Sequence, residues 1–292
     1  MSTTGPGTAV LAVSPHLDDA AFSAGALLAG LAAQGADVRV LTVFTASVPD
    51  PRGFALACQT DKGLAPDVDY MELRRGEDEA AMAALGVRSA HLGLAEAPHR
   101  GYADAAALFG PVVAGDEDTP DAVAAAIEAE LARPGAPRPR LLLGPAALGE
   151  HVDHRHVRDA LALLARRHGL PSVLWDDLPY ALRTPAGAAG PFRRGATAEE
   201  TAAKLAACAA YASQLGFQFG SVAAMHEALQ PRAEAFTADP EATAPRFGGR
   251  VGRSTPSPGT EVPGAIPSTR LSRWDPAPGF ADEGAVPAPR QD

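Results

Sequence analysis

The sequence predicts an α/β protein of Rossmann-like, three-layer architecture, with a mostly parallel sheet between two layers of helices and a Pro/Gly-rich C-terminal tail. Short apolar runs alternate with longer stretches of helical spacing over roughly the first 175 residues, an alternation typical of parallel α/β sheets. The first 45 residues read as strand, helix and strand, and such a unit requires parallel strands joined by a right-handed crossover. Ligands of such folds bind beyond the carboxyl ends of the strands.

The elements follow in order from apolar spacing and from the residues that end each run. The run AVLAV at 9–13 predicts a strand, the stretch up to Gly35 predicts a helix, and DVRVLTVF at 37–44 predicts the next strand. Further helices are predicted at 72–85, 121–131, 152–168 and 199–215, and further strands at 89–92, 140–143 and 172–175.

The chain divides into a domain at residues 1–236 and a tail at 237–292. The tail holds ten of the 27 prolines with few apolar residues, so it buries too little surface to offset the entropy lost on ordering. We therefore expect it to be mostly disordered, with Trp274 and Phe280 able to dock on the domain.

Composition excludes several classes of function. A net charge of −10 repels a polyanion, so we expect no nucleic-acid partner. The sequence has no apolar run of about 18 residues, which excludes a membrane span, and no basic, apolar leader at its start. The two cysteines, Cys58 and Cys208, form no thiolate metal motif and favour a cytoplasmic location. A homo-oligomer is allowed but not indicated.

A first group of candidate functional residues lies where the first strand gives way to a helix. His16, Asp18 and Asp19 occur within four positions of this loop. Either carboxylate could serve only as the N-cap of the helix, where it would accept a backbone N–H at the positive end of the helix dipole.

A second group opens the helix at 152–168. His151 and His154 are three residues apart and share one face of the first turn, with Asp153 between them. Because both groups follow strands of one parallel sheet, we expect them to meet as a set of two histidines and an aspartate, which zinc accepts while keeping a position for water. His151 could replace His154 as the ligand. His156 lies on another face and is predicted at the surface.

These motifs resemble the PIG-L/LmbE-like deacetylase family. SPHLDDAAFSAGALLA is similar to its PHPDDE-type signature, and HVDH is similar to its HxDH signature, in the same order and at the same strand ends. Weaker similarity covers 73–87, 91–102, 176–183 (DDLPYALR) and 204–214, so the resemblance spans about residues 8–216.

The resemblance implies a zinc-dependent N-deacetylase that hydrolyses the acetamide of an N-acetylated amino sugar or a related glycoconjugate, with one zinc ion per chain. It implies that His16, Asp19 and His154 bind zinc, that Asp18 is the general base, and that Asp153 orients a histidine. It also implies that His151 stabilises the oxyanion or protonates the leaving amine, and the nearby aspartates would favour its protonation. The sequence departs from the family pattern at Leu17, usually proline, and at Ala20, usually acidic.

Three arginines are candidate substrate ligands, and other functions remain as alternatives. Arg74, Arg75 and Arg100 could hold hydroxyls or a phosphate, and Tyr180 could pack beside the site. A nucleotide-binding oxidoreductase lacks the required G-x-G-x-x-G after its first strand, because SPHLDD occupies that turn. A zinc hydrolase of another amide or ester bond, and a non-catalytic sugar-binding protein, are the remaining alternatives.

Overall fold

A single sheet of eight strands forms the centre of the fold in a computed structural model that describes residues 7–182, 190–230, 232–238 and 252–253. The strand order is β3-β2-β1-β4-β5-β7-β6-β8. Neighbours from β3 to β5 are parallel, and the remaining pairs are antiparallel. The strands are β1 (Ala9–Ser14), β2 (Asp37–Phe44), β3 (Arg88–Leu94), β4 (Leu141–Pro145), β5 (Ser172–Trp175), β6 (Phe192–Arg194), β7 (Glu234–Ala238) and β8 (Gly252–Arg253).

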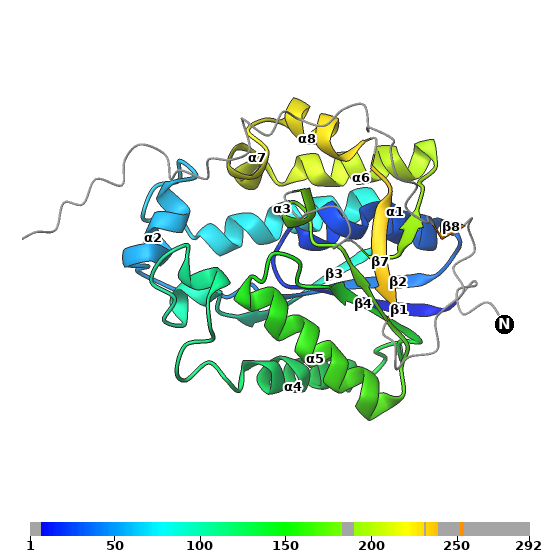
Figure 1. Cartoon of the computed structure of the whole chain (residues 1–292), viewed down its shortest axis with the longest axis horizontal. Coiled ribbons are helices and arrows are strands. Elements are labelled where there is room, and N and C mark those ends of the chain that lie inside the picture. Colours follow the sequence, from blue (N-terminus) through cyan, green and yellow to red (C-terminus); the bar gives the residue numbers. More distant parts are fainter. Residues whose placement is uncertain (1–6, 183–189, 231, 239–251, 254–292) are drawn as a thin grey trace, which may run out of the picture. The chain divides into compact units, whose positions relative to one another are not determined.

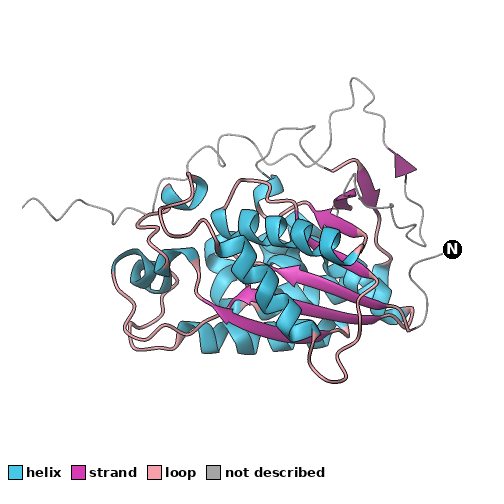
Figure 2. Cartoon of the chain, turned by 90° about the horizontal axis from the view of Figure 1, so that it is seen from below, coloured by secondary structure: helices cyan, strands magenta, loops and turns pink. Residues whose placement is uncertain are grey.

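Helices cover both faces of the sheet (Figures 1 and 2). On one face lie α1 and α3, with α6 packed against both of them and α7 and α8 beside α6. On the other face lie α4 and α5, which pack against each other. The helices are α1 (Asp19–Ala33), α2 (Gly53–Thr60), α3 (Tyr70–Leu85), α4 (Thr119–Leu131), α5 (Val152–His168), α6 (Ala198–Ala210), α7 (Ala212–Gln218) and α8 (Val222–Leu229). The predicted three-layer α/β fold is therefore confirmed.

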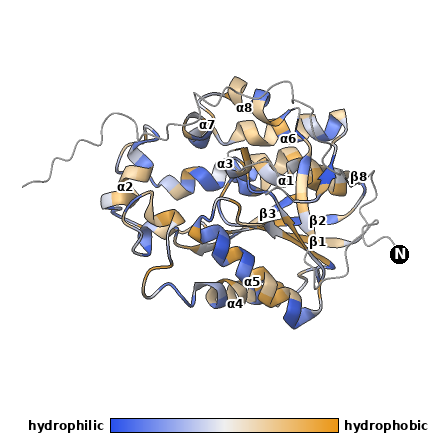
Figure 3. Ribbon diagram, in the orientation of Figure 1, coloured by the Kyte–Doolittle hydropathy of each residue, from blue (hydrophilic) through white to orange (hydrophobic). Residues whose placement is uncertain are grey.

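The side chains of β1 alternate between two apolar cores. Val10 and Ala12 belong to the core beneath α1, α3 and α6, whereas Leu11 and Val13 belong to the core beneath α4 and α5. Figure 3 shows apolar colour along the sheet and mixed colour on the helices around it. A strand buried on both faces reads as a continuous apolar run, which is why AVLAV is recognisable in the sequence.

The strand order places a topological switch point between β1 and β4. From β1 the chain adds β2 and β3 on one side, and it later adds β4 and β5 on the other side. Crossover connections leave in opposite directions there, so the loops after the two strands separate and make room for a ligand. The loop after β1 contains His16, and the loop after β4 leads to His151.

Most predicted elements are present, and the main differences lie in the last third of the domain. The single helix predicted at 199–215 is two helices, α6 and α7, because the backbone at Tyr211 leaves helical geometry. The structure adds α2, α8 and three antiparallel strands that the apolar pattern did not predict. Strand β7 crosses the predicted boundary after residue 236 and ends at Ala238. Apart from that end and β8, the tail at 237–292, with Trp274 and Phe280, lies outside the described residues.

A buried ion pair connects α6 to β7. Lys204 Nζ lies 2.8 Å from Glu234 Oε1, and both side chains are buried. The carboxylate of Glu234 also accepts hydrogen bonds from the backbone N–H groups of Ala26 and Leu27 in α1, each at 2.8 Å. Glu234 therefore connects three elements, and Lys204 is the cation that compensates its charge.

We expect Lys204→Met to lower the free energy of unfolding by about 3–5 kcal/mol, because it leaves a carboxylate buried without its cation. Urea denaturation followed by circular dichroism measures the change. The double variant with Glu234→Gln should recover part of the loss, since it removes the uncompensated charge. A loss below about 1 kcal/mol, the value of an exposed pair, would contradict this role for the ion pair.

Candidate metal centre and active site

The loop after β1 leaves both of its aspartates available to the site. Ser14 Oγ accepts the hydrogen bond of the Ala20 N–H at 3.1 Å and donates to the carbonyl of His16 at 2.8 Å, so Ser14 serves the first turn of α1. Asp18 stands at the N-cap position but makes no capping hydrogen bond with its side chain. Asp19 Oδ2 instead accepts the N–H of His16 at 2.9 Å. The alternative that either carboxylate serves only as the helix cap is therefore wrong.

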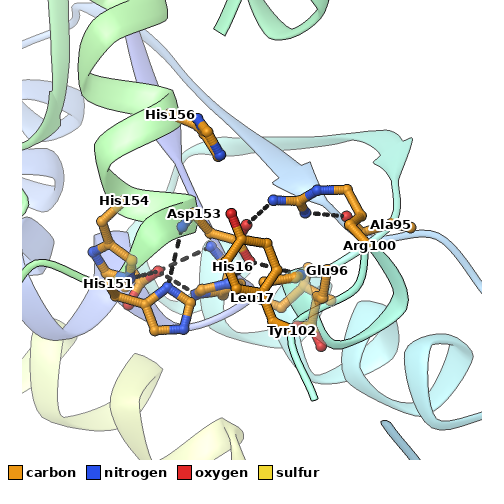
Figure 4. A network of polar contacts seen from close by, with 12 residues as sticks. His16, Leu17, Ala95, Glu96, Arg100, Tyr102, His151, Asp153, His154 and His156 are labelled. Carbon is orange, nitrogen blue, oxygen red and sulfur yellow. Dashed lines mark hydrogen bonds and ion pairs between the residues drawn. The ribbon is translucent and has the colours of Figure 1, made fainter. Parts of the chain in front are cut away.

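The loop after β4 presents the second group from the start of α5. His151 is the N-cap residue, and its Nδ1 accepts the backbone N–H of Asp153 at 3.2 Å. Asp153 and His154 lie in the first helical turn, and both are fully buried. Figure 4 shows the rings of His16, His151 and His154 gathered together with the carboxylate of Asp153. The two groups predicted from the sequence therefore meet.

His16, Asp19 and His154 form a candidate metal centre. Each offers one ligand atom, and these atoms lie within 4.8 Å of one another. His16 Nδ1 is 3.2 Å from Asp19 Oδ2, and His154 Nε2 is 3.3 Å from the same oxygen. His154 Nε2 is buried without a hydrogen-bond partner among the described residues. Such an atom costs free energy unless a ligand satisfies it, so the set fits a metal ion.

An overlapping group of His16, His151 and Asp153 also brings three ligand atoms together. The carboxylate of Asp153 and Nδ1 of His151 already have hydrogen-bond partners within the protein. Asp153 accepts hydrogen bonds from His16, the Ala97 N–H and Arg100, and His151 Nδ1 accepts one from the backbone. His154 Nε2 is the histidine nitrogen that is buried without a hydrogen-bond partner in the described residues, which favours the first set over the alternative in which His151 replaces His154.

Each candidate histidine ligand is oriented by a carboxylate on its other ring nitrogen. His16 Nε2 lies 2.9 Å from Asp153 Oδ2, and His154 Nδ1 lies 2.7 Å from Asp177 Oδ1. Carboxylates in this position fix the ring orientation of metal-binding histidines and raise their basicity. Asp177 was not predicted as a site residue. The only sequence signal for it is its place in the weakly matching DDLPYALR that follows β5.

We expect Asp177→Asn to lower zinc affinity about 10- to 100-fold, as loss of such a carboxylate usually does. Competition against a chromogenic chelator measures the affinity. Asp176→Asn is a matched control, since this neighbouring buried carboxylate accepts the Gly190 N–H and contacts no histidine ligand. Parent affinity in the Asp177 variant would show that His154 needs no orienting carboxylate.

Burial and neighbouring charge separate the protonation behaviour of the two adjacent aspartates. Burial and the Asp19 charge raise the pKa of Asp18 to about 7, although Arg74 opposes the shift. Burial alone would also raise the pKa of Asp19, but the charges of His154 and His16 lower it. Asp19 therefore stays ionised as a ligand should, whereas Asp18 can exchange a proton near neutral pH.

Burial and neighbouring charge also shift the pKa values of His16 and His151 in opposite directions. Burial would lower the pKa of His16, yet its hydrogen bonds to Asp153 and Asp19 hold that pKa well above its usual value. Burial and the charge of His16 lower the pKa of His151 well below its usual value. Asp153 and Asp19 do favour the protonated form, as expected, but burial and the charge of His16 outweigh them in the pKa of His151. His151 is neutral, and because its Nδ1 accepts a hydrogen bond, its Nε2 carries the proton.

The three arginines predicted to contact substrate all have partners within the protein. Arg74 is buried, donates to Glu96 at 2.6 Å, and lies 3.7 Å from Asp18 Oδ1. Arg75 donates to the Thr45 carbonyl at 2.7 Å. Arg100 donates to Asp116 and Asp153. These contacts account for the position of each guanidinium, and contact with substrate stays a prediction.

Two further features complete the surroundings of the site. Aromatic rings lie beside it, with the Tyr180 ring 5.3 Å from that of His154 and the Phe109 ring 5.4 Å from that of His151. Phe109 is partly exposed, at 41%. The prediction that His156 lies at the surface is wrong, because it is buried and its Nε2 lies 2.9 Å from Asp116 Oδ2. The face of α5 that carries His156 packs against the loops after β3.

Fold and site together define an α/β protein with a His/Asp metal centre at the switch point of its sheet. A family model described as PIG-L, GlcNAc-PI de-N-acetylase, matches residues 11–165. That match covers more than half of the chain and includes both motifs, so the chain belongs to the PIG-L family.

Individual relatives agree with this assignment. The chain is 36% identical over 173 residues to a 2'-N-acetylparomamine deacetylase of Streptomyces fradiae, covering 59% of this chain and 57% of that protein. It therefore aligns with only a little over half of that relative's length. A crystal structure described as the zinc-inhibited form of teicoplanin deacetylase Orf2 matches with a TM-score of 0.68 at 31% identity, covering 80% of this chain and all of that one.

A second solved structure agrees. The A40926 pseudoaglycone deacetylase Dbv21 matches with a TM-score of 0.64 at 32% identity, covering 78% of this chain and 95% of that chain.

Within the part of the chain that the structure describes, no helix is both long and apolar enough to cross a membrane. Cys58 and Cys208 are both free thiols.

Proposed function

We propose that this protein is a zinc-dependent N-deacetylase that hydrolyses the acetamide of an N-acetylated amino sugar or of a glycoconjugate containing one. The observation that carries the proposal is the convergence of His16, Asp19 and His154 from two distant loops, with Asp18 beside them. The relatives described as deacetylases of acetylparomamine, teicoplanin and the A40926 pseudoaglycone support this substrate class.

The donor set suits one zinc ion per chain. Two imidazole nitrogens and a carboxylate oxygen are ligands that catalytic zinc sites use, and such sites keep a position for water. His154 Nε2, buried and without a hydrogen-bond partner in the described residues, fits the same role. When bound, zinc would lower the pKa of a coordinated water to about 7 and polarise the amide carbonyl.

Asp18 is the proposed proton carrier. Its Oδ2 accepts a hydrogen bond from Gln218 Nε2 at 3.2 Å, and its other oxygen lies 3.7 Å from Arg74. A carboxyl with a pKa near 7 can take the proton of the attacking water and later give it to the departing amine, which leaves readily only when protonated. This assignment gives the second proton transfer to Asp18 in place of His151.

His151 is the proposed donor to the negative charge that develops on the carbonyl oxygen. Its Nδ1 is engaged by the Asp153 N–H, which leaves Nε2–H as the group able to donate. A donor that is already oriented stabilises such a charge without reorganisation at the moment of reaction. Of the two roles expected for His151, stabilisation of the oxyanion is therefore the one we retain.

The test is acetate release from a panel of N-acetylated amino sugars and glycoconjugates, with the metal content of the untagged protein measured in parallel. We expect zinc at one equivalent per chain and stoichiometric release of acetate and free amine. Turnover of esters or of other amides alone would contradict the proposed bond specificity. A zinc-loaded protein that binds these sugars without releasing acetate would identify a non-catalytic sugar-binding protein. The cytoplasmic location stays a prediction.

A further inference from the structure

Asp153 is a carboxylate in the interior whose two oxygens serve different partners. Its side chain is fully buried. Oδ2 lies 2.9 Å from His16 Nε2 and accepts the Ala97 N–H at 3.1 Å, whereas Oδ1 accepts from Arg100 Nη2 at 2.6 Å. A buried charge is tolerated only when it is paired and hydrogen-bonded. Arg100 is the cation that meets this requirement, while Oδ2 remains directed at His16 (Figure 4).

Arg100 is itself held at several points. Its Nε donates to Asp116 Oδ1 at 2.8 Å and its Nη2 to Asp116 Oδ2 at 3.1 Å, which makes a two-pronged ion pair. Its Nη1 donates to the Ala95 carbonyl at 2.6 Å, and its guanidinium lies over the Phe44 ring at 4.7 Å. A planar guanidinium fixed in this way has one orientation. Its contact with Asp153 is therefore defined in position as well as in charge.

Asp116 in turn is fixed by three side chains from separate parts of the chain. It accepts from the Tyr102 hydroxyl at 2.8 Å and the Thr119 hydroxyl at 2.6 Å, and it lies 2.9 Å from His156 Nε2. His156 belongs to α5, the helix whose first turn holds His154. The loops after β3 and the start of α5 are thus joined around one carboxylate.

We propose that Arg100 and Asp116 are positioning residues of the metal centre, which act through Asp153 to set the orientation and basicity of His16. The polar contacts run without a break from His16 through Asp153 and Arg100 to Asp116. This role rests on the proposed zinc site, since it assumes that His16 binds the metal. It also accounts for Arg100 without any contact to substrate.

The test compares zinc affinities by chelator competition in the full-length protein. We expect Arg100→Met to weaken zinc binding about 10- to 100-fold, the range for loss of a group that orients a metal ligand. Arg100→Lys should fall between this variant and the parent, because it keeps the charge without the fork geometry. Asp116→Asn should also weaken zinc binding, and it serves together with Arg100→Lys if Arg100→Met does not fold. The absorption bands of the cobalt-substituted protein should shift in each variant.

Arg39→Met is the matched control for a merely structural effect. The side chain of Arg39, at the start of β2, is about as exposed as that of Arg100, 17% against 16%, and it pairs with the buried Glu130 of α4, away from the site. The Arg39→Met substitution should lower the stability of the protein while leaving its zinc affinity and its cobalt spectrum unchanged. Parent-like zinc affinity in folded Arg100 and Asp116 variants would overturn the inference, as would an equal loss in Arg39→Met. A parent protein that binds no zinc would instead overturn the proposed function.

Discussion

Asp18→Asn should keep its zinc and lose deacetylase turnover, with kcat lower by about 10²- to 10⁴-fold, the usual contribution of a general acid–base group. An amide side chain of the same shape cannot accept the proton of the attacking water. The carboxylate of Asp19 and both histidine ligands remain in place. Steady-state acetate release measures kcat, and metal analysis of the same sample measures the zinc content.

Asp78→Asn is a suitable control for this experiment. Asp78 is equally buried in α3, where it accepts from the Tyr211 hydroxyl at 2.7 Å and lies 2.9 Å from His91, and it takes no part in the site. Its amide variant should turn over at close to the parent rate. If Asp18→Asn with full zinc also hydrolyses at the parent rate, Asp18 is not the proton carrier.

His16→Ala should lose both the metal and the activity. His16 offers one of the three ligand atoms that lie within 4.8 Å of one another, and two protein ligands leave the ion exposed to removal by chelators. We expect a larger fall in zinc affinity than the 10- to 100-fold typical of an orienting carboxylate. Chelator competition and acetate release, measured on the same preparation, should fall together.

The control for the histidine variant lies at the far end of α5. His168, the last residue of that helix, is exposed and contacts Glu128 at 2.9 Å. His168→Ala should keep parent zinc content and turnover. Retention of one tightly bound zinc in His16→Ala would mean that the ion is held by other residues, and the ligand assignment would then be wrong.

The parallel half of the fold could be predicted because its strands are buried on both faces. Leu11 and Val13 face one core while Val10 and Ala12 face the other, so the strand has no polar positions to obscure it. The antiparallel strands lack this signal. Phe192–Arg194 is short and only partly buried, and Glu234–Ala238 begins with a charged residue whose partners lie in α1 and α6. Such long-range pairing leaves no local periodicity.

The residues of the site also fall into a group that could be predicted from the sequence and a group that could not. His16, Asp19, His151 and His154 could be predicted to meet because each follows a strand of one parallel sheet, and topology alone brings those ends together. The contacts behind them could not be predicted. The side chain of Asp177 reaches His154 across 23 residues of sequence, and Asp116 contacts both Arg100 in the loop after β3 and His156 in α5. Which carboxylate supports which histidine depends on packing that no spacing in the sequence records.

Anomalous diffraction at the zinc edge, from crystals of the untagged protein, tests the central claim most directly. We expect one zinc per chain, at about 2.0–2.2 Å from Nδ1 of His16, Nε2 of His154 and a carboxylate oxygen of Asp19. A peak coordinated by His151 and Asp153, or no peak between the loops after β1 and β4, would contradict the proposed metal centre and the hydrolytic mechanism derived from it.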